Sequence, residues 1–229
     1  MTASAFADGG YADRFVLVVD DHELVGASIV VALAARGTAA RQCRLTSTKG
    51  ILDAADRLGR RGVVLLDLDL GFDAAGTRID EIELIRGFSS RGWRVLVLSA
   101  VTDRRRVAAA IVAGSAGFVA KAAPLDELLD TVTAAADGRP VLRRAERATW
   151  VALHEQQRAR DKHKHVRLRR LTAREREILE LLAQGERAAV IAEEACVSLS
   201  TVRSQIRSIL TKLEVNSQLE AAALLRDDS

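Results

Sequence analysis

Aromatic residues are scarce in this sequence, at 3% of 229 residues, so we expect a core of valine, leucine, isoleucine and alanine side chains. Long apolar runs are also missing, because neither the N-terminus nor any internal segment has the apolar length of a signal peptide or a membrane span. The lack of such apolar segments predicts a cytoplasmic protein that has no membrane partner. The length suffices for one large or two small domains.

Cysteine is nearly absent as well. Cys43 and Cys196 lie far apart in apolar surroundings, which predicts two buried free thiols rather than a disulfide or a metal site. Three of the few histidines, His154, His163 and His165, stand among basic residues with no set of carboxylate or thiol ligands nearby. This pattern favours a solvated basic segment over a metal site.

Charge is distributed unevenly along the chain, although the net charge is only +3. Residues 139–170 hold 11 Lys and Arg against 3 Asp and Glu, whereas the segments before and after them are weakly acidic. A basic segment of this kind suits a linker that lies near a polyanion.

Residues 14–138 alternate apolar runs with amphipathic segments. Strands are expected at residues 15–20, 39–45, 62–67, 94–99 and 116–120, and helices at about 22–36, 49–59, 79–90, 103–113 and 124–137. This order predicts a doubly wound α/β fold with a five-stranded parallel sheet. Residues 1–13 are expected to be a disordered tail, and residues 139–168 a basic, partly helical linker.

From residue 169 to residue 229 the pattern is purely helical. Thr172 and Glu175 have the spacing of a capping box at the start of the first of four helices. Further helices are expected at about 188–195, 198–213 and 216–226. A short helix, a tight turn and a longer helix form the helix-turn-helix arrangement that binds DNA.

Carboxylates follow two of the predicted strands. Asp20 and Asp21 follow the first strand and Asp67 ends the third, while Ser99 and Lys121 stand at the ends of the fourth and fifth. Because ligands bind beyond the carboxyl ends of parallel strands, these residues are placed to form one site. Three neighbouring carboxylates repel one another and are tolerated mainly around a hard divalent cation such as Mg²⁺.

Such a pocket suits phosphoryl transfer. Asp67 would be the nucleophile that forms an acyl phosphate, Lys121 would supply positive charge, and Ser99 a hydroxyl donor. The alternative is that the acids only cap strand ends and the lysine is solvated. Five such residues in the right strand order favour the pocket.

The predicted helix 198–213 has two faces. Val202, Ile206, Ile209 and Leu213 form an apolar face at helical spacing. Arg203 and Arg207, four residues apart on the opposite side, point the same way and suit bidentate contacts to guanine edges. Two arginines alone would equally fit a solvated face, and the helix-turn-helix context favours DNA.

Four segments resemble the receiver domain of two-component response regulators, over about residues 14–138. They are Val18-Val19-Asp20-Asp21-His22, Leu65-Leu66-Asp67, Val97-Leu98-Ser99-Ala100 and Gly117-Phe118-Val119-Ala120-Lys121-Ala122-Ala123-Pro124. The resemblance implies strand order 2-1-3-4-5, with Asp67 as the phosphoacceptor and Lys121 as the phosphate-binding lysine. It also implies that Mg²⁺ is held by Asp20, Asp21, Asp67 and the backbone carbonyl of Asp69.

The same resemblance implies a switch. In that family the hydroxyl at the position of Ser99 moves toward the phosphoryl group, and the aromatic ring at the position of Phe118 turns inward. This movement remodels the face made by the fourth helix, fifth strand and fifth helix, which is read out by dimerisation.

Two departures leave alternatives open. The segment after Asp67 has no proline, forms a longer loop, and places an extra carboxylate, Asp69, beside the phosphoacceptor. A receiver that signals without phosphorylation therefore stays an alternative. Leu66-Asp67-Leu68-Asp69 also resembles the nucleophile motif of haloacid-dehalogenase-type phosphatases, but residues 122–138 lack the strand and acidic pair which those enzymes place after their lysine.

The last part of the chain, about residues 169–226, resembles the four-helix DNA-binding domain of LuxR-type regulators. The matching segments are Leu171-Thr172-Ala173-Arg174-Glu175-Arg176-Glu177-Ile178-Leu179, Ile191-Ala192, Ser200-Thr201-Val202-Arg203 and Ile209-Leu210-Thr211-Lys212-Leu213. The resemblance implies that the residues which face base edges are Arg203, Ser204 and Arg207. It implies that the residues near the DNA backbone are Thr201, Gln205, Lys212 and Arg187. The last helix, with Leu219, Ala222 and Ala223, corresponds to a dimer surface.

This domain also departs from its family. Glu214 replaces the usual glycine after the recognition helix, so we expect a strained or reshaped corner. Ala188 and Ala189 stand where polar phosphate contacts are common, so the basic linker is expected to contribute much of the non-specific affinity.

Together these resemblances predict a bacterial DNA-binding response regulator that is not an enzyme. Its expected partners are double-stranded DNA, a sensor histidine kinase that phosphorylates Asp67, and a second copy of itself in an active homodimer.

Overall fold

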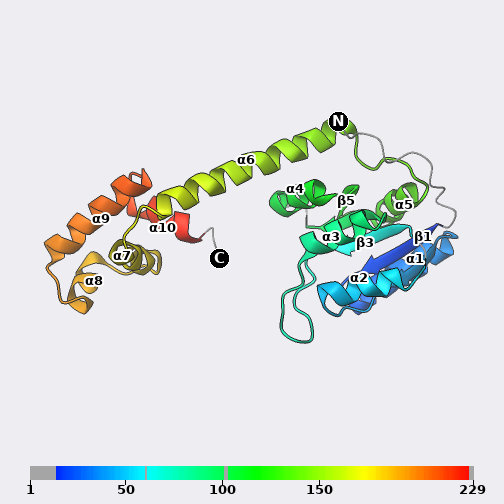
Figure 1. Cartoon of the computed structure of the whole chain (residues 1–229), viewed down its shortest axis with the longest axis horizontal. Helices are drawn as coiled ribbons and strands as arrows, with labels where there is room; N and C mark the ends of the chain where they lie inside the picture. The colour runs from blue at the N-terminus through cyan, green and yellow to red at the C-terminus, as the bar shows by residue number, and fades with distance from the viewer. Residues whose placement is uncertain (1–13, 60, 101–102, 227–229) are drawn as a thin grey trace. The chain divides into compact units, whose positions relative to one another are not determined.

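The computed structural model describes residues 14–59, 61–100 and 103–226 (Figure 1). The chain divides into two compact units, Met1–Glu155 and Gln156–Ser229. The predicted tail, residues 1–13, lies outside the described residues. The described strands and helices begin and end within three residues of their predicted positions, except for one long helix in the segment expected to be a partly helical linker.

The first unit is built on a five-stranded parallel sheet of order β2-β1-β3-β4-β5, as predicted. Its strands are β1 (Phe15–Val19), β2 (Ala39–Gln42), β3 (Val63–Asp67), β4 (Arg94–Ser99) and β5 (Gly117–Ala120). Every residue of β1 and β3 is buried. Continuous apolar strands form here because helices cover both faces of the sheet.

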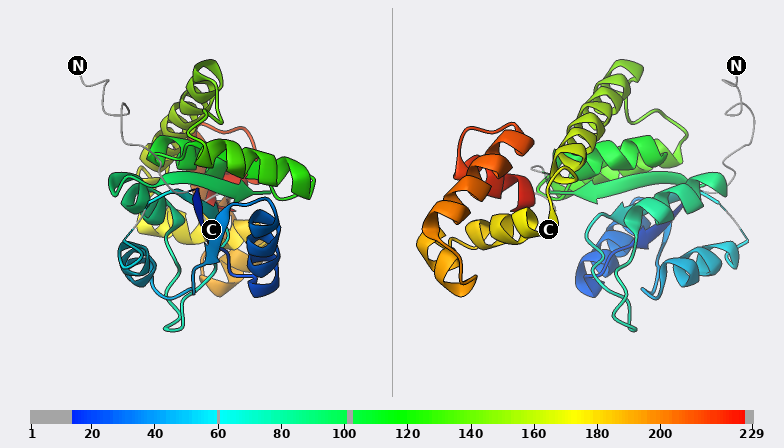
Figure 2. Two further views of the ribbon diagram at one scale, coloured as in Figure 1. Left: turned by 90° about the vertical axis from the view of Figure 1, so that its right-hand side faces the viewer. Right: turned by 60° about the vertical axis from the view of Figure 1, so that its left-hand side comes forward.

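Helices cover both faces of that sheet (Figures 1 and 2). They are α1 (Glu23–Ala35), α2 (Thr48–Asp56), α3 (Glu81–Ser90), α4 (Arg104–Ala113) and α5 (Leu125–Ala136). Alternate strand residues enter two aliphatic cores, so Leu17 packs with α2, α3 and α4, whereas Val18 packs with α1 and α5. The cores are mostly aliphatic, as predicted from the composition.

The long loop after β3 is a small hairpin. Leu70 and Ile79 bury its base in the core, and Phe72 pairs with Arg78 in an antiparallel bridge. The carboxylate of Asp73 accepts two backbone N–H groups in the turn. The residues that depart from the receiver pattern therefore form an ordered protrusion anchored beside the pocket.

Helix α6 (Arg144–Leu168) is continuous over 25 residues (Figures 1 and 2). Its residues up to Glu155 belong to the first unit and the rest belong to the second. In the part of the chain that the structure describes, no helix combines the length and apolar character needed to cross a membrane.

The second unit contains α7 (Ala173–Ala183), α8 (Ala188–Glu194), α9 (Leu199–Leu213) and α10 (Gln218–Arg226). The predicted capping box is present, because the Thr172 hydroxyl accepts from the Glu175 N–H and the Glu175 carboxylate accepts from the Thr172 N–H. Buried residues of its core include Ile178, Leu179, Ile191, Val202, Ile206, Ile209 and Leu213. The apolar face predicted for the recognition helix is therefore confirmed.

One prediction about cysteine is wrong. Cys43 is buried, but Cys196 is exposed. Cys196 lies in the turn between α8 and α9 with φ of 50°, and its neighbour Val197 is 41% exposed. Its apolar surroundings in sequence belong to a surface turn and not to a core-facing helix.

Candidate functional site

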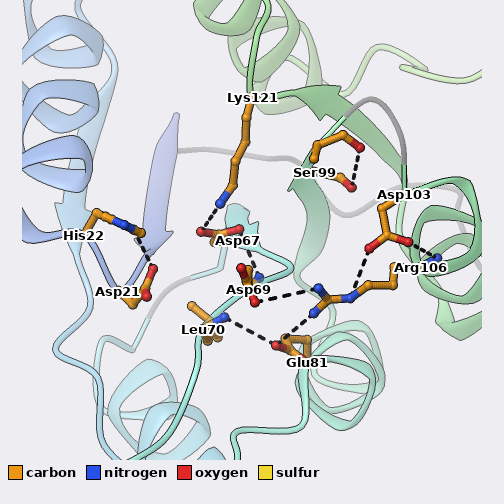
Figure 3. Close-up of polar contacts among 11 residues, drawn as sticks. Asp21, His22, Asp67, Asp69, Leu70, Glu81, Ser99, Asp103, Arg106 and Lys121 are labelled. Carbon is orange, nitrogen blue, oxygen red and sulfur yellow. Dashed lines mark hydrogen bonds and ion pairs between the residues drawn. The ribbon is translucent and has the colours of Figure 1, made fainter. Parts of the chain in front are cut away.

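The predicted carboxylates meet at the carboxyl ends of β1 and β3. Figure 3 shows two of them, Asp21 and Asp67. Asp20 directly follows β1 and Asp67 ends β3, and these neighbouring strands run parallel with their ends aligned. One ligand atom each from Asp20, Asp21, His22 and Asp67 lies within 4.8 Å of the others. Asp67 is 0% exposed and Asp20 is 4% exposed.

Lys121 and Ser99 complete the predicted pocket. The Nζ of Lys121 donates to Oδ2 of Asp67 at 2.6 Å. Ser99 is buried at the end of β4 and lines the same pocket, where its hydroxyl donates to the carbonyl of Ala100 at 3.1 Å. The ends of four strands thus bring the five predicted residues to one edge of the sheet.

The pocket carries more negative charge than its lysine balances. Burial raises the pKa of Asp67 against the opposing hydrogen bond from Lys121, and the charge of Asp20 adds to the rise. Burial would lower the pKa of Lys121, but the hydrogen bond and charge of Asp67 outweigh it, so that pKa is also raised. The hydrogen bond to Asp21 and its charge raise the pKa of His22. This set of oxygen donors therefore fits a hard divalent cation.

Arg106, on α4, is a pocket residue that the sequence did not reveal (Figure 3). Its guanidinium lies 3.7 Å from the carboxylate of Asp69, 3.3 Å from that of Glu81 and 3.5 Å from that of Asp103. The extra carboxylate beside the phosphoacceptor is thus paired with a cation. Three consecutive arginines occur at 104–106, and nothing in the sequence distinguishes the one that faces the pocket.

Phe118, the predicted switch ring, is half-buried on β5. It lies edge-on to Trp150 of α6, with ring centroids 5.2 Å apart and 78° between the planes. The guanidinium of Arg104 lies 5.3 Å from the Trp150 ring. The sequence does not indicate this contact of Trp150, because contacts between distant segments leave no local pattern.

The recognition helix α9 presents its predicted polar face to solvent. Arg203, Ser204 and Arg207 are exposed, opposite the buried apolar residues of the same helix. Ser198 caps the helix by accepting the N–H of Thr201 at 3.1 Å. The side chains of the two arginines are therefore exposed and do not pack in the core of their own unit.

The other predicted DNA contacts differ in their surroundings. Thr201 and Arg187 are exposed, whereas Gln205 is half-buried and its Oε1 has no hydrogen-bond partner within the described residues. Lys212 is held by Glu175, with its Nζ 2.6 Å and 2.8 Å from the two carboxylate oxygens. Lys212 thus stabilises this unit through its ammonium group.

The corner after α9 has the expected strain. Glu214 has φ of 56° and ψ of 45°, the left-handed conformation that glycine adopts most easily. Its carboxylate pairs with Arg170 at 2.6 Å, and Arg167 donates to the carbonyl of Leu213 at 2.9 Å. These contacts hold the corner in place of glycine.

One residue of the predicted dimer surface is placed wrongly. Leu219 is 74% exposed and Ala223 is also exposed, but Ala222 is only 3% exposed. Helix α10 turns both Ala221 and Ala222 toward the rest of its own unit. Ala222 is therefore a packing residue.

A parallel sheet of order 2-1-3-4-5 with an acidic pocket at its edge, joined in one chain to a helix-turn-helix, defines a DNA-binding response regulator. The family described as "Bacterial regulatory proteins, luxR family" matches residues 169–225. The transcriptional regulatory protein LiaR of Bacillus subtilis (strain 168) is 30% identical over 215 residues, which cover 90% of this chain and 94% of LiaR. The chain therefore belongs to the response regulators with a LuxR-type DNA-binding domain, which control transcription.

Two further proteins are similar to this chain over more than nine-tenths of its length. The nitrate/nitrite response regulator protein NarL of Escherichia coli (strain K12) is 28% identical over 216 residues, covering 93% of this chain and 95% of NarL. The crystal structure of the response regulator ChrA, from a heme-sensing two-component system, aligns with a TM-score of 0.42 and 28% identity, covering 94% of this chain and 98% of ChrA. The relatives LiaR and NarL are regulators and not enzymes, so the phosphatase alternative is set aside.

Replacing Arg106 should strengthen cation binding. In Arg106→Gln the pocket loses a positive charge and Asp69 loses a partner, so the affinity for Mg²⁺ should rise about 2–5-fold in calorimetric titration. Arg105→Gln removes the same charge from the neighbouring position and serves as the control. Equal changes in both variants would mean that only net charge matters.

The pair of Glu175 and Lys212 should give the second unit a pH-dependent stability. Burial opposes the charged form of Glu175, but hydrogen bonds from Lys212, Thr172 and Ser208 lower its pKa from 4.5 to about 2. The resulting stabilisation is complete above pH 4.5 and is lost as the pH falls toward about 2. Lys212→Met should therefore lower the unfolding free energy by about 1–3 kcal/mol at neutral pH and by progressively less in acid.

Hydrogen exchange of α7 and α9 in the full chain, at several urea concentrations, would measure this loss of unfolding free energy. The matched control is Lys162→Met, which removes an exposed lysine from the same unit. A loss for Lys212→Met that stays constant between neutral pH and the pKa of Glu175 would contradict the assignment.

Proposed function

We propose that phosphorylation of Asp67 switches this regulator into a homodimer that binds promoter DNA sequence-specifically. The observation that carries the proposal is the position of Asp67, which is 0% exposed, 2.6 Å from a lysine amine and clustered with Asp20 and Asp21. A buried carboxylate is costly to keep charged unless it is paired. Carboxylates in such surroundings cluster at functional sites.

In the proposed reaction a carboxylate oxygen of Asp67 attacks the phosphorus of a phosphohistidine on a sensor kinase, or of a small phosphodonor. The bond from phosphorus to the donor breaks, and an acyl phosphate forms on Asp67. Lys121 places positive charge beside the transferred group, and the Ser99 hydroxyl donates to one of its oxygens. Asp20, Asp21, Asp67 and the carbonyl of Asp69 would hold Mg²⁺, which neutralises phosphoryl charge when bound.

For DNA binding we propose that α9 enters the major groove. Arg203, Ser204 and Arg207 face base edges, and backbone contacts come from Thr201, Gln205, Lys212 and Arg187. Exposed residues of α10, among them Leu219 and Ala223, form the dimer surface, so that two copies read half-sites about one helical turn apart. The basic residues of α6 add affinity for any DNA sequence.

We assign residues 14–138 to the receiver, 139–168 to the linker and 169–229 to the DNA-binding domain of a cytoplasmic regulator. The partition into compact units falls later, inside α6, at Glu155. The difference arises because the first turns of α6 pack on the receiver core through Trp150.

Phosphotransfer to Asp67 is tested with a labelled small phosphodonor and Mg²⁺, with Asp67→Asn as the control. The wild type should be labelled and should bind its promoters more tightly in genome-wide mapping, whereas Asp67→Asn should show neither change. An unlabelled wild type with unchanged promoter occupancy would instead identify a receiver that signals without phosphorylation.

Mutations should distinguish the residues that read DNA bases from those that attract the DNA backbone. Arg203→Ala should cost about 1–3 kcal/mol on the cognate site and relax one base position, because a bidentate contact is lost. Arg158→Gln with Arg160→Gln, in the exposed part of α6, should weaken binding to all sequences alike and reduce its salt dependence. Binding isotherms on cognate and scrambled DNA at several salt concentrations would distinguish them, and equal losses on both sequences for Arg203→Ala would refute base reading.

A further inference from the structure

We propose that the imidazole of His22 is a direct ligand of the cation site, and that it makes the site prefer first-row transition ions to Mg²⁺. This inference rests on the proposed function and names the class of cation that the site takes. In the proposed function the cation is held only by oxygen atoms, from Asp20, Asp21, Asp67 and the carbonyl of Asp69. His22 adds a nitrogen donor to that set.

The His22 ring is spaced as a metal ligand from the neighbouring carboxylates. One potential ligand atom from each of Asp20, Asp21, His22 and Asp67 lies within 4.8 Å of the others. The Nδ1 of His22 is 2.7 Å from Oδ1 of Asp21, toward which the ring points in Figure 3, and 3.5 Å from Oδ1 of Asp20. Two ligands at right angles around an ion about 2.1 Å away lie about 3 Å apart. The imidazole therefore stands at the spacing of two ligands that share one ion.

The backbone holds His22 in this position. Its N–H donates to Oδ1 of Asp20 at 2.7 Å, and its carbonyl accepts from the N–H of Gly26 at 3.0 Å in the first turn of α1. His22 is the N-cap residue of that helix, but its side chain makes no capping hydrogen bond. Serine, threonine, aspartate and asparagine are the residues that cap helices well. Helix capping thus gives no reason for histidine here, and the ring faces carboxylates instead.

A plain ion pair between His22 and Asp21 is the simpler reading of the same contact. The side chain of His22 is 64% exposed, and ion pairs with so much exposure contribute little stability. A divalent cation on Nδ1 would replace the proton that this nitrogen donates to Asp21. The cation compensates two negative charges where the proton compensates one, so it suits the surplus of carboxylates in the pocket better.

The position of the ring also gives an ion access to the buried carboxylates. Asp20 and Asp67 are buried, whereas Asp21 and His22 are exposed. His22 therefore lies at the rim of the cluster, where a hydrated ion arriving from solvent can exchange a water molecule for the imidazole.

The nitrogen donor decides which cation the site favours. Mg²⁺ takes oxygen ligands and keeps several of its waters, whereas imidazole suits first-row transition ions such as Fe²⁺, Ni²⁺ and Zn²⁺. Co²⁺ lies within that series and serves as a probe. Removing the imidazole should therefore weaken the binding of Co²⁺ much more than the binding of Mg²⁺.

Calorimetric titrations of the full chain test this selectivity. Co²⁺ and Mg²⁺ are titrated separately into the wild type and into His22→Gln, which keeps a polar side chain but has no imidazole. We expect His22→Gln to lose about tenfold in affinity for Co²⁺ and less than about twofold for Mg²⁺. The control His163→Gln removes an exposed histidine of α6 and should change neither affinity. Equal losses for the two ions in His22→Gln would overturn the inference.

Pulsed electron paramagnetic resonance of the Mn²⁺-loaded protein tests direct contact between the ion and the ring. The wild type and His163→Gln should show the coupling of a nitrogen nucleus bound to Mn²⁺, and His22→Gln should not. A histidine that only positions Asp21 would give no such coupling in the wild type, and that result would also overturn the inference.

Phosphotransfer to Asp67 separates the fate of this inference from that of the proposed function. If Asp67 is labelled in the presence of Mg²⁺ while the wild type shows no nitrogen coupling, the inference is overturned and the proposed function stands. If nitrogen coupling is present but Asp67 is never labelled, His22 is a ligand and the proposed function fails. If neither Co²⁺ nor Mg²⁺ binds and Asp67 is not labelled, both fail.

Discussion

A buried carboxylate at the end of a central parallel strand is the constraint on which the molecule depends. Asp67 is fully buried, and its neighbour Asp20 is nearly so. Burying charge is expensive unless partners compensate it, and Lys121 compensates one charge of several. The edge of the sheet therefore keeps an unbalanced negative charge, which suits the proposed binding of a divalent cation.

The surrounding residues limit what that charge does. Arg106 joins Asp69, Glu81 and Asp103, so it ties the loop after β3 to the starts of α3 and α4. The loop itself is anchored through buried Leu70. The loop, α3 and α4 therefore meet at one guanidinium, which lines the pocket that contains Asp67.

The residues that sequence reasoning located are those with a local pattern. Asp20 and Asp67 follow apolar strands, and strand pairing brings such ends together in any parallel sheet. The apolar face of α9 follows from its period. The Arg106 contacts and the ring pair of Phe118 with Trp150 join residues far apart in sequence, so neither composition nor spacing indicates them. The ion pair of Lys212 with Glu175, two helices away, likewise leaves no local pattern in the sequence.

The errors have a common cause as well. Cys196 was assigned from its apolar neighbours in sequence and Ala222 from its position in the LuxR-type resemblance. Exposure depends instead on the turn geometry and on the helix phase that the tertiary fold selects. The exposure of a small or apolar residue therefore follows least from sequence where it stands beside a turn or on a helix with two candidate faces.

The central claim, that Asp67 lies in a pocket with excess negative charge, is tested most directly by carbon NMR of its side-chain carboxyl group. Titration of the cation-free protein should give a pKa for Asp67 above that of an ordinary aspartate, because burial and Asp20 disfavour its charge. Saturating Mg²⁺ should lower that pKa. An ordinary pKa in the cation-free protein that Mg²⁺ leaves unchanged would contradict the account.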